Sequence, residues 1–243
     1  MPAESLADRE STVRPAIDLS IGGRLTMVAI GYIPLLHLGC CLALALLLAR
    51  YQGYTWSAAA TAAAIYLVPP LATRIVRLRA TEPEARHAVG SAMFLKWWYT
   101  SQWQVLFQRL PILEELLRLA PGLYSAWLRL WGAKVGRLVY WSPGLILFDR
   151  GFLDIGDHVV IGANSKICPH LLSRSPEGEM QLLLAPVVIG HDTMIGGSTL
   201  LPAGVQVGPC EQTPGFKPLA PFAQFRDGQH IRTTRFNGEA QNE

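Results

Sequence analysis

The chain has 243 residues, of which half are hydrophobic and only 16% are charged, against roughly 25% in a typical soluble domain. This composition excludes a disordered chain, because there is ample apolar surface to bury. The net charge of +3, from 21 basic and 18 acidic residues, is too small to indicate a nucleic-acid partner. The four cysteines form no C-x-x-C pair, so neither a disulfide framework nor a zinc knuckle is expected.

The apolar residues are concentrated near the N-terminus. No Asp, Glu, Lys or Arg lies between Arg24 and Arg50, nor between Arg50 and Arg74. Each stretch exceeds the about 20 helical residues that cross a bilayer core, and a short turn at 52–54 joins them. The sequence therefore predicts a polar leader over 1–24 and a transmembrane helical hairpin over 25–79. A cleaved signal peptide and a buried soluble hairpin are the alternatives.

The basic residues indicate the orientation of this hairpin. The turn carries only Arg50, whereas five basic residues follow the second stretch: Arg74, Arg77, Arg79, Arg86 and Lys96. Cytoplasmic flanks of membrane spans carry an excess of Lys and Arg. We therefore expect a multi-pass protein of the cell inner membrane, with two spans and with everything after residue 80 in the cytoplasm.

Region 80–131 combines aromatic residues with helical spacing. Five of the seven tryptophans lie between residues 97 and 131, and Pro111 and Pro121 divide the region into short helices. Tryptophan prefers the headgroup level of a membrane, so the pattern predicts amphipathic interfacial helices over 80–131. The alternative is an ordinary core stripe packed on the next domain, and the two interpretations can hold on opposite faces.

A hexapeptide repeat begins at residue 135. An aliphatic residue followed by glycine or another small residue recurs every six positions over 135–146, slips by two residues in LFDRGF (147–152), and resumes over 155–170 and 189–208. In a triangular parallel β-helix, each unit forms one flat face and one corner, and three units form one coil. The sequence predicts a mainly β domain of about three such coils over 132–208. Strands of a β-sandwich would instead alternate with period two.

A prism of about three coils has little interior for its surface and needs caps or partners. We expect the helices of 80–131 to cap its N-terminal end, and a homotrimer to form with the prism axes side by side. Segment 209–243 is polar and contains several prolines. It is expected to be a C-terminal extension that wraps the outside or frays.

The hexapeptide register breaks directly after Cys168, Pro169 and His170. The inserted segment 171–186 holds Pro, Gly, Ser and mixed charges, which indicates a loop that leaves the coil. Long loops in compact folds are usually functional. A histidine fixed on a rigid wall beneath such a loop is well placed for chemistry.

Four motifs resemble those of hexapeptide-repeat acyltransferases: GAKVG (132–136), IGDHVVIGANSKI (155–167), GEM (178–180) and APVVIGHDTMIGGSTLLPAGVQVG (185–208). The resemblance is to galactoside, maltose and exopolysaccharide O-acetyltransferases, and to the membrane-bound C-terminal β-helix modules of poly-lysine-type peptide synthetases. It implies a left-handed parallel β-helix, His170 as general base and a site between two subunits. The chain departs from the family at its Asp-Asn turns, which are Asp157-His158 and His191-Asp192 here, and in lacking the usual tail after Val207-Gly208.

The reaction expected from this resemblance is transfer of an acyl group, most simply from acetyl-CoA, to a hydroxyl or amine of a membrane-associated glycan, lipid or peptide. Imidazole is largely neutral near pH 7 and can accept the proton of the attacking group, which is the role expected of His170. Backbone N–H groups at Gly197 or Ser198 are expected to contact the coenzyme and the oxyanion. Asn164 and Ser165 are expected to orient the acceptor.

Two other classes of protein stay open. One is a non-catalytic membrane-anchored β-helix scaffold. The other is a zinc hydratase like the γ-class carbonic anhydrases, which needs three histidines around one zinc ion. His170 and His191 are 21 residues apart and no H-x-x-x-x-H pair is present, so no metal is expected.

Overall fold

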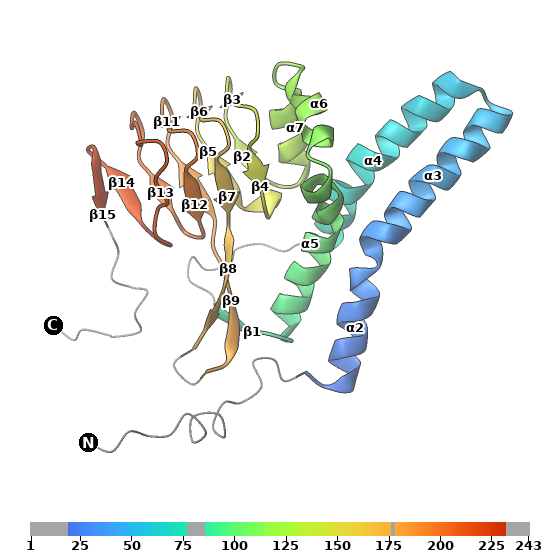
Figure 1. Cartoon of the computed structure of the whole chain (residues 1–243), viewed down its shortest axis with the longest axis horizontal. Helices are drawn as coiled ribbons and strands as arrows, with labels where there is room; N and C mark the ends of the chain where they lie inside the picture. Colours follow the sequence, from blue (N-terminus) through green and yellow to red (C-terminus); the bar gives the residue numbers. More distant parts are fainter. Residues whose placement is uncertain (1–18, 77–85, 176–177, 232–243) are drawn as a thin grey trace.

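The computed structural model describes residues 19–76, 86–175 and 178–231. Helices occupy the N-terminal part of the chain and stand against one end of a coil of short parallel strands (Figure 1). The axis of the coil leads away from these helices, so they lie against its first turns and not against its far end (Figure 1). The helical segment next to the coil therefore decides what surrounds its first turns.

Three helices form the N-terminal hairpin: α2 (Ile21–Gly31), α3 (Ile33–Tyr51) and α4 (Tyr54–Val76). The hydroxyl of Ser20 caps α2 by accepting a hydrogen bond from the backbone N–H of Gly23 at 3.1 Å. Gly53, with φ of +89°, makes the left-handed turn between α3 and α4. The helices and turn predicted over 25–79 are present, and α2 begins inside the predicted leader, whose residues 1–18 lie outside the described part of the chain.

Both arms of the hairpin are long and apolar enough to cross a bilayer. Segment Ile21–Tyr51 has 31 residues and Tyr54–Val76 has 23, and the mean hydropathies of their 18-residue apolar windows are 2.2 and 1.4. Only 11% and 17% of their most apolar stretches are buried inside the protein. Most of this apolar surface is therefore left for a medium outside the described chain.

Helices α5 (Ala92–Arg109), α6 (Ile112–Arg118) and α7 (Leu123–Leu130) form the cap between the hairpin and the coil. Trp97, Trp127 and Trp131 are at most 6% exposed, so these tryptophans form core and not a headgroup belt. Their burial follows from the bare end of the coil, which offers an apolar surface for aromatic rings to cover. The opposite face of α6 leaves Ile112 and Leu116 exposed, so only that face keeps the predicted interfacial character.

The coil has three walls of parallel strands. Its first turn contains β2 (Lys134–Val135), β3 (Tyr140–Trp141) and β4 (Ile146–Leu147). The second contains β5 (Leu153–Ile155), β6 (Val160–Ile161) and β7 (Lys166–Cys168). The third contains β10 (Val187–Ile189), β11 (Met194–Ile195) and β12 (Leu200–Pro202), and β13 (Gln206–Val207) opens the next.

The register of this coil follows the hexapeptide pattern. Val135 pairs with Ile155, Ile155 with Ile189, and Ile189 with Val207. All four side chains are at most 8% exposed. The aliphatic residue of each hexapeptide therefore points into the prism and stacks on its counterpart one turn away, as predicted for a parallel β-helix.

The coil does not end at residue 208. Strand β14 (Gln224–Arg226) pairs with β13 in parallel, and Gln212 and Pro218 bridge to the third turn on the other two walls. Buried Thr213, Leu219 and Phe225 continue the six-residue register from Val207. The predicted boundary at 208 is therefore too early, because threonine and phenylalanine occupy aliphatic places there. The final strand β15 (Gln229–Ile231) pairs antiparallel with β14, and residues 232–243 lie outside the described chain.

Segment 171–186 is a hairpin and not an irregular loop. Strands β8 (His170–Arg174) and β9 (Met180–Leu184) pair antiparallel, and β1 (Arg86–Ala88) adds to the outer edge of β9. Leu182 and Leu184 are buried against Phe94 and Trp97 of α5. The hairpin is thus fixed by packing on the cap, which the sequence of the insertion alone did not indicate.

Candidate active site

His170 lies where the chain leaves the second turn of the coil and enters β8. Its Nδ1 is hydrogen-bonded to Oδ2 of Asp149, and the indole N–H of Trp97 donates to Oδ1 of the same carboxylate at 2.9 Å. The Trp97 ring lies edge-on to the imidazole with 5.0 Å between ring centroids. Asp149 is 3% exposed and the His170 side chain is 22% exposed. The imidazole is therefore oriented by a buried carboxylate and still reaches solvent.

The Asp149 carboxylate controls the protonation of His170. Burial alone lowers the pKa of His170, but the nearby charge and hydrogen bond of Asp149 outweigh burial and raise the pKa to about 10. A carboxylate can only accept at this position, so Nδ1 carries the proton that it shares with Asp149. The nitrogen left for acid–base chemistry is Nε2. With a pKa of about 10, Nε2 is also protonated near pH 7, so the neutral imidazole expected from the sequence is the minor form there and becomes the major form only above that pKa.

Helix α5 fixes Asp149 through its neighbour Arg150. Asp149 has a left-handed φ of 43°, and the next residue begins the short 3₁₀ helix Arg150–Phe152. The Gln104 side-chain oxygen accepts hydrogen bonds from the backbone N–H and from Nη1 of Arg150, both at 2.9 Å. Trp97 and Gln104 of one helix therefore hold the turn that carries the carboxylate.

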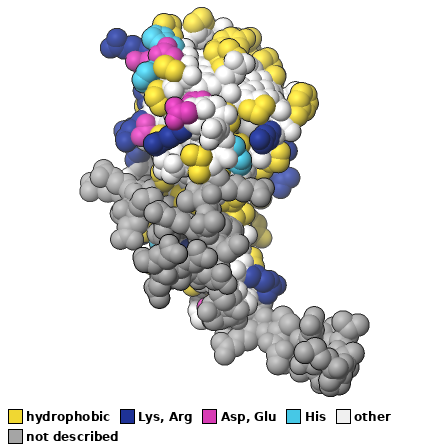
Figure 2. Space-filling model, turned by 90° about the vertical axis from the view of Figure 1, so that its left-hand side faces the viewer, with side chains coloured by type: hydrophobic (Ala, Val, Ile, Leu, Met, Phe, Trp, Pro, Cys, Tyr) yellow, Lys and Arg dark blue, Asp and Glu magenta, His cyan; other side chains and the backbone are white. Residues whose placement is uncertain are grey.

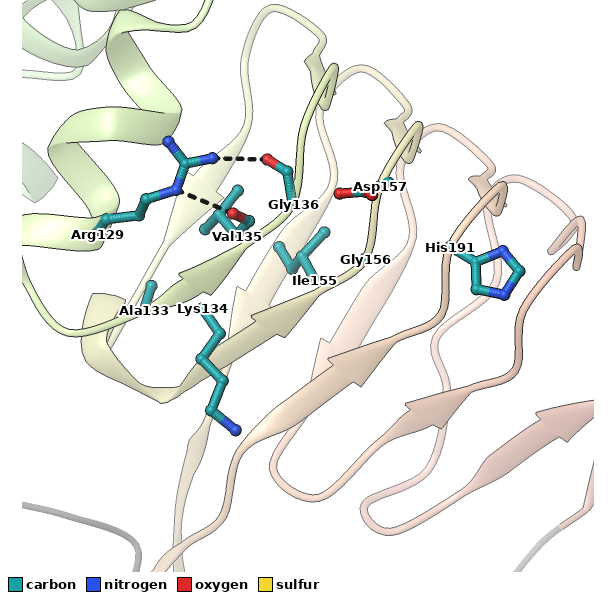
Figure 3. Close-up of a pocket in the computed structure, with 9 residues that line it drawn as sticks. All are labelled: Arg129, Ala133, Lys134, Val135, Gly136, Ile155, Gly156, Asp157 and His191. Carbon is teal, nitrogen blue, oxygen red and sulfur yellow. Dashed lines mark hydrogen bonds between the residues drawn. The ribbon is translucent and has the colours of Figure 1, made fainter.

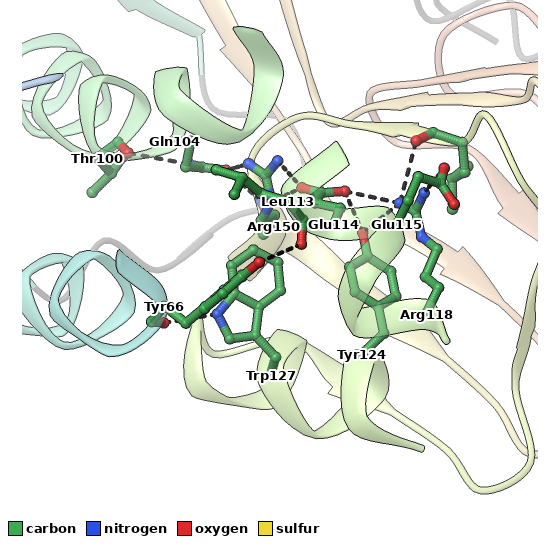
Figure 4. A network of polar contacts seen from close by, with 11 residues as sticks. Tyr66, Thr100, Gln104, Leu113, Glu114, Glu115, Arg118, Tyr124, Trp127 and Arg150 are labelled. Atoms are coloured by element: carbon green, nitrogen blue, oxygen red, sulfur yellow. Dashed lines mark hydrogen bonds and ion pairs between the residues drawn. The ribbon is translucent and has the colours of Figure 1, made fainter. Parts of the chain in front are cut away.

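Arg150 is itself paired inside the protein (Figure 4). Its guanidinium is 1% exposed, donates from Nε to Glu114 at 2.8 Å, and pairs with the same carboxylate through Nη2. Glu114 also accepts from Arg118 at 2.8 Å and from the Tyr124 hydroxyl at 2.7 Å. A buried ion pair needs hydrogen bonds to its remaining polar atoms, and the Arg150–Glu114 pair receives them from Gln104, Arg118 and Tyr124. The network joins α6, α7 and the coil, although Nε of Arg118 is buried without a partner.

The same cap ties the N-terminal helical hairpin to this network. The Tyr66 hydroxyl donates to the backbone oxygen of Leu113, and the indole N–H of Trp127 donates to the backbone oxygen of Tyr66, both at 2.8 Å. Arg74 donates to the backbone oxygens of Leu130 and Arg129 at the end of α7. The hairpin, the cap and the Asp149 turn are therefore connected by hydrogen bonds.

A cavity of about 870 Å³ lies beside Asp149, within the usual size range of ligand pockets. Thr73 and Arg74 from the end of α4 line it together with Thr100 and Gln104 of α5. Lys134, Phe152, Asp154 and Pro186 contribute from the coil side. The chamber thus joins the end of the apolar hairpin to the carboxylate that orients His170.

A second, shallower groove of about 520 Å³ runs along the first wall of the coil (Figure 3). Arg129, Lys134 and Asp157 line it, and His191 stands at its far edge on the third turn. Arg129 donates to the backbone oxygens of Val135 at 2.9 Å and Gly136 at 2.8 Å, which fixes α7 on this wall.

The structure separates His170 from the other predicted site residues. Asn164 lies at the corner before β7, six residues and about 20 Å of extended chain from His170. Ser165 is completely buried, and its hydroxyl donates to the backbone oxygen of Gly196 at 3.2 Å, so it cannot touch an acceptor. The prediction for Ser165 is wrong because the fifth place of a hexapeptide faces the interior.

Gly197 and Ser198 lie at the same corner as Asn164, one turn further along the coil. The N–H of Ser198 donates to the backbone oxygen of Ala163 at 2.7 Å, so this N–H serves the coil and is not an oxyanion donor. Within one chain, Asn164 and Gly197 therefore do not face His170.

Sequence reasoning missed Asp149 and Trp97. Asp149 sits in the two-residue slip of the repeat, LFDRGF, where an acidic residue departs from the hexapeptide pattern. That irregularity was the available signal, since departures from a structural repeat are often functional. Nothing in the local sequence of Trp97 connects it to a residue 52 positions later.

No family model and no curated protein matches the chain. Solved structures that resemble it include a hexapeptide-repeat-containing acetyltransferase from Vibrio cholerae, with 16% identity, coverage of 54% of this chain and 91% of that one, and a TM-score of 0.34. For a maltose O-acetyltransferase from Clostridium difficile 630, the identity is 15%, the match covers 61% of this chain and 92% of that one, and the TM-score is 0.35. For a galactoside acetyltransferase in complex with coenzyme A, the identity is 15%, the match covers 53% of this chain and 82% of that one, and the TM-score is 0.29. With TM-scores below 0.5, these likenesses carry no functional conclusion for this chain.

Proposed function

We propose that the chain is a membrane-anchored acyltransferase that uses His170 as general base. The observation that carries the proposal is the His170–Asp149 pair, because a half-buried imidazole held by a buried carboxylate is a recurrent acid–base device. The donor is an acyl-CoA thioester, most simply acetyl-CoA. The acceptor is a hydroxyl or amine of a membrane-associated glycan, lipid or peptide.

In the proposed reaction, the acceptor oxygen or nitrogen attacks the thioester carbonyl while Nε2 of His170 removes its proton. The tetrahedral intermediate collapses, the carbon–sulfur bond breaks, and the proton passes from Nε2 to the leaving thiolate. Asp149 accepts the hydrogen bond of the Nδ1–H group throughout and stabilises the imidazolium that forms. Acid–base catalysis by a positioned group contributes roughly 10²–10⁴ in rate.

The membrane anchor is supported by the exposed apolar surface of the hairpin. Leu42, Leu46 and Leu47 of α3 are between 59% and 65% exposed, and Ile75 at the end of α4 is 80% exposed. Burying such side chains in lipid is favourable by about 25 cal/mol per Å² of apolar surface. We propose that both arms span the inner membrane and that the coil lies in the cytoplasm.

The cavity beside Asp149 suits an amphipathic acceptor. Thr73 and Arg74 line it from the end of α4, where a membrane span would emerge from the bilayer. An acceptor whose tail stays in lipid would reach the chamber with its polar head, without crossing the coil.

A homotrimer would complete the site. Asn164 and Gly197 stand one wall away from His170 in the same chain, so a neighbouring subunit would have to supply that corner to the reaction. This arrangement agrees with the shared sites implied by the sequence resemblance, and it places the donor and the base on different chains.

The purified full chain in detergent, incubated with labelled acetyl-CoA and a membrane lipid extract, tests this function by mass spectrometry. A product heavier by one acetyl unit is expected with the native protein and with His87→Ala, whose histidine lies in β1. It is expected to be lost with His170→Ala. If no acceptor fraction gives a product and calorimetry shows no binding of coenzyme A, the non-catalytic scaffold is favoured. If His170→Ala still turns over, His170 is not the general base.

A further inference from the structure

Three residues at one corner of the coil stack on successive turns. Asp192 and Cys210 are 18 residues apart, which is one turn of three hexapeptides, and His158 precedes Asp192 by one turn plus the inserted hairpin. Backbone hydrogen bonds of 2.8 Å confirm the stacking: Asp192 donates to the oxygen of Asp157, and Cys210 to that of His191. This corner lies at the start of β6 and β11, one wall away from the corner of His170.

The side chains at this corner converge on one carboxylate. Nδ1 of His158 lies 3.1 Å from Oδ1 of Asp192, and Nδ1 of His191 lies 2.8 Å from Oδ2. The donor atoms of His191, Asp192 and Cys210 all lie within 4.8 Å of one another. His158, His191 and Asp192 are each more than half exposed, so an ion in solution can reach them. Figure 2 shows histidine and acidic side chains together at one edge of this end of the molecule.

We propose that His158, His191, Asp192 and Cys210 bind a divalent transition metal of the zinc class, which clamps the second, third and fourth turns of the coil together. Two imidazoles, one carboxylate and one thiolate form a donor set that zinc uses in tetrahedral sites. Bonds of about 2.0–2.3 Å place tetrahedral donors about 3.3–3.6 Å apart. The ligand atoms of His191, Asp192 and Cys210 already lie within 4.8 Å of one another. His158 lies next to them through Asp192, at 3.1 Å, so the bound metal would draw its imidazole in as the fourth ligand.

This corner would otherwise favour different residues. His158, Asp192 and Cys210 all have φ between 55° and 59°, a region that glycine and asparagine adopt most readily. Aspartate and histidine also enter this region readily, whereas cysteine does not, so Cys210 is the residue that the backbone of this corner does not favour. The γ-class zinc site considered from the sequence is different, because it uses three histidines and neither Asp nor Cys.

Metal binding would change the protonation of the cluster. The Cys210 thiol has to lose its proton to become a ligand, so metal binding would release protons and weaken as the pH falls.

Titration of the metal-stripped full chain with Zn²⁺ and with Co²⁺ tests the site. We expect one metal per chain, a higher melting temperature, and a near-ultraviolet charge-transfer band of thiolate-bound cobalt. Cys210→Ser should abolish that band, and His191→Gln should weaken zinc binding at least tenfold. Cys40→Ser in α3 and His87→Gln in β1 are the matched controls and should bind as the native chain does.

Equal binding by the native chain, Cys210→Ser and His191→Gln would overturn the proposal, as would no binding at micromolar zinc. The exposed positions of both substitutions should leave the fold intact, which circular dichroism of the metal-free proteins checks. Acyl transfer takes no part in these measurements, so the metal site can fail while the proposed function stands, and the reverse.

Discussion

Two corners of the same coil carry a histidine–aspartate pair, and they differ mainly in what covers them. At His170 the aspartate is 3% exposed, lies against Trp97 of the cap and raises the pKa of the histidine. At His158 and His191 the shared aspartate is 51% exposed. Opposite charges interact strongly only where water is excluded. The comparison shows that packing against the cap, and not the residue pair itself, buries the aspartate at one corner and leaves it exposed at the other.

The largest effect should separate the two corners directly. His170→Ala removes the base, and we expect acyl transfer to fall by about 10²–10⁴. His158→Ala removes an exposed imidazole from the other corner and should leave acyl transfer unchanged. Initial rates with labelled acetyl-CoA measure both, and equal losses would mean that the corners are not functionally distinct.

The network that supports the buried corner should dominate stability. Glu114→Gln removes the charge that partners Arg150, which is 1% exposed, and leaves a buried guanidinium uncompensated. Breaking a buried pair in this way costs about 3–5 kcal/mol. Denaturant unfolding of the detergent-solubilised protein measures the loss, with Glu179→Gln in the β8–β9 hairpin as control. A loss equal to that of the control would contradict the role given to this network.

The pH dependence sharpens the comparison further. Because Asp149 raises the pKa of His170 to about 10, kcat/KM should rise with pH up to that region in the native protein. Asp149→Asn removes the charge, so the histidine pKa should fall and the acid limb of the profile should move to lower pH. A pH profile unchanged by Asp149→Asn would show that the pair does not control the base.

The same pair should link stability to pH. A histidine whose pKa is raised on folding stabilises the fold fully below its unfolded pKa of about 6.5. That contribution should be lost as the pH rises towards 10 in the native protein. Melting temperatures measured from pH 6 to pH 10 should therefore decline more steeply for the native chain than for Asp149→Asn.

The Trp97 hydrogen bond should have a moderate effect. Trp97→Phe keeps an aromatic ring but removes the N–H that donates to Asp149 at 2.9 Å, which should cost about 1–3 kcal/mol by leaving a buried acceptor short of a donor. We expect kcat to fall while KM for the donor stays the same, because Trp97 acts on His170 through its hydrogen bond to Asp149. Trp103→Phe is the control. If both variants have the same kcat, Trp97 does not position the His170–Asp149 pair.

The smallest effect is expected at the exposed corner. In the metal-free protein, Asp192→Asn should hardly change the melting temperature, because exposed ion pairs are screened by water and salt. In the presence of zinc the same substitution should lower it. A large loss in the metal-free protein would show that the hydrogen bonds of this corner stabilise the coil by themselves.

The sequence predicted the coil much better than its surroundings. The stacked ladder of Val135, Ile155, Ile189 and Val207 follows from the hexapeptide register, because each turn repeats the same local requirement. The sequence prediction missed the fourth turn because Thr213 and Phe225 occupy positions where the hexapeptide pattern has aliphatic residues. The β8–β9 hairpin was missed because its strands are held by packing on α5 and not by a pattern of their own.

The sequence by itself determined the helical hairpin, the three-walled coil and the position of His170 at the break in the repeat. Periodic patterns report local geometry, and these features are local. Only the tertiary structure decided that Asp149 and Trp97 meet His170, that Ser165 faces the interior, and that His158, Asp192 and Cys210 share a corner. These contacts join residues 18 to 73 positions apart, and the packing of the cap and of successive turns creates them.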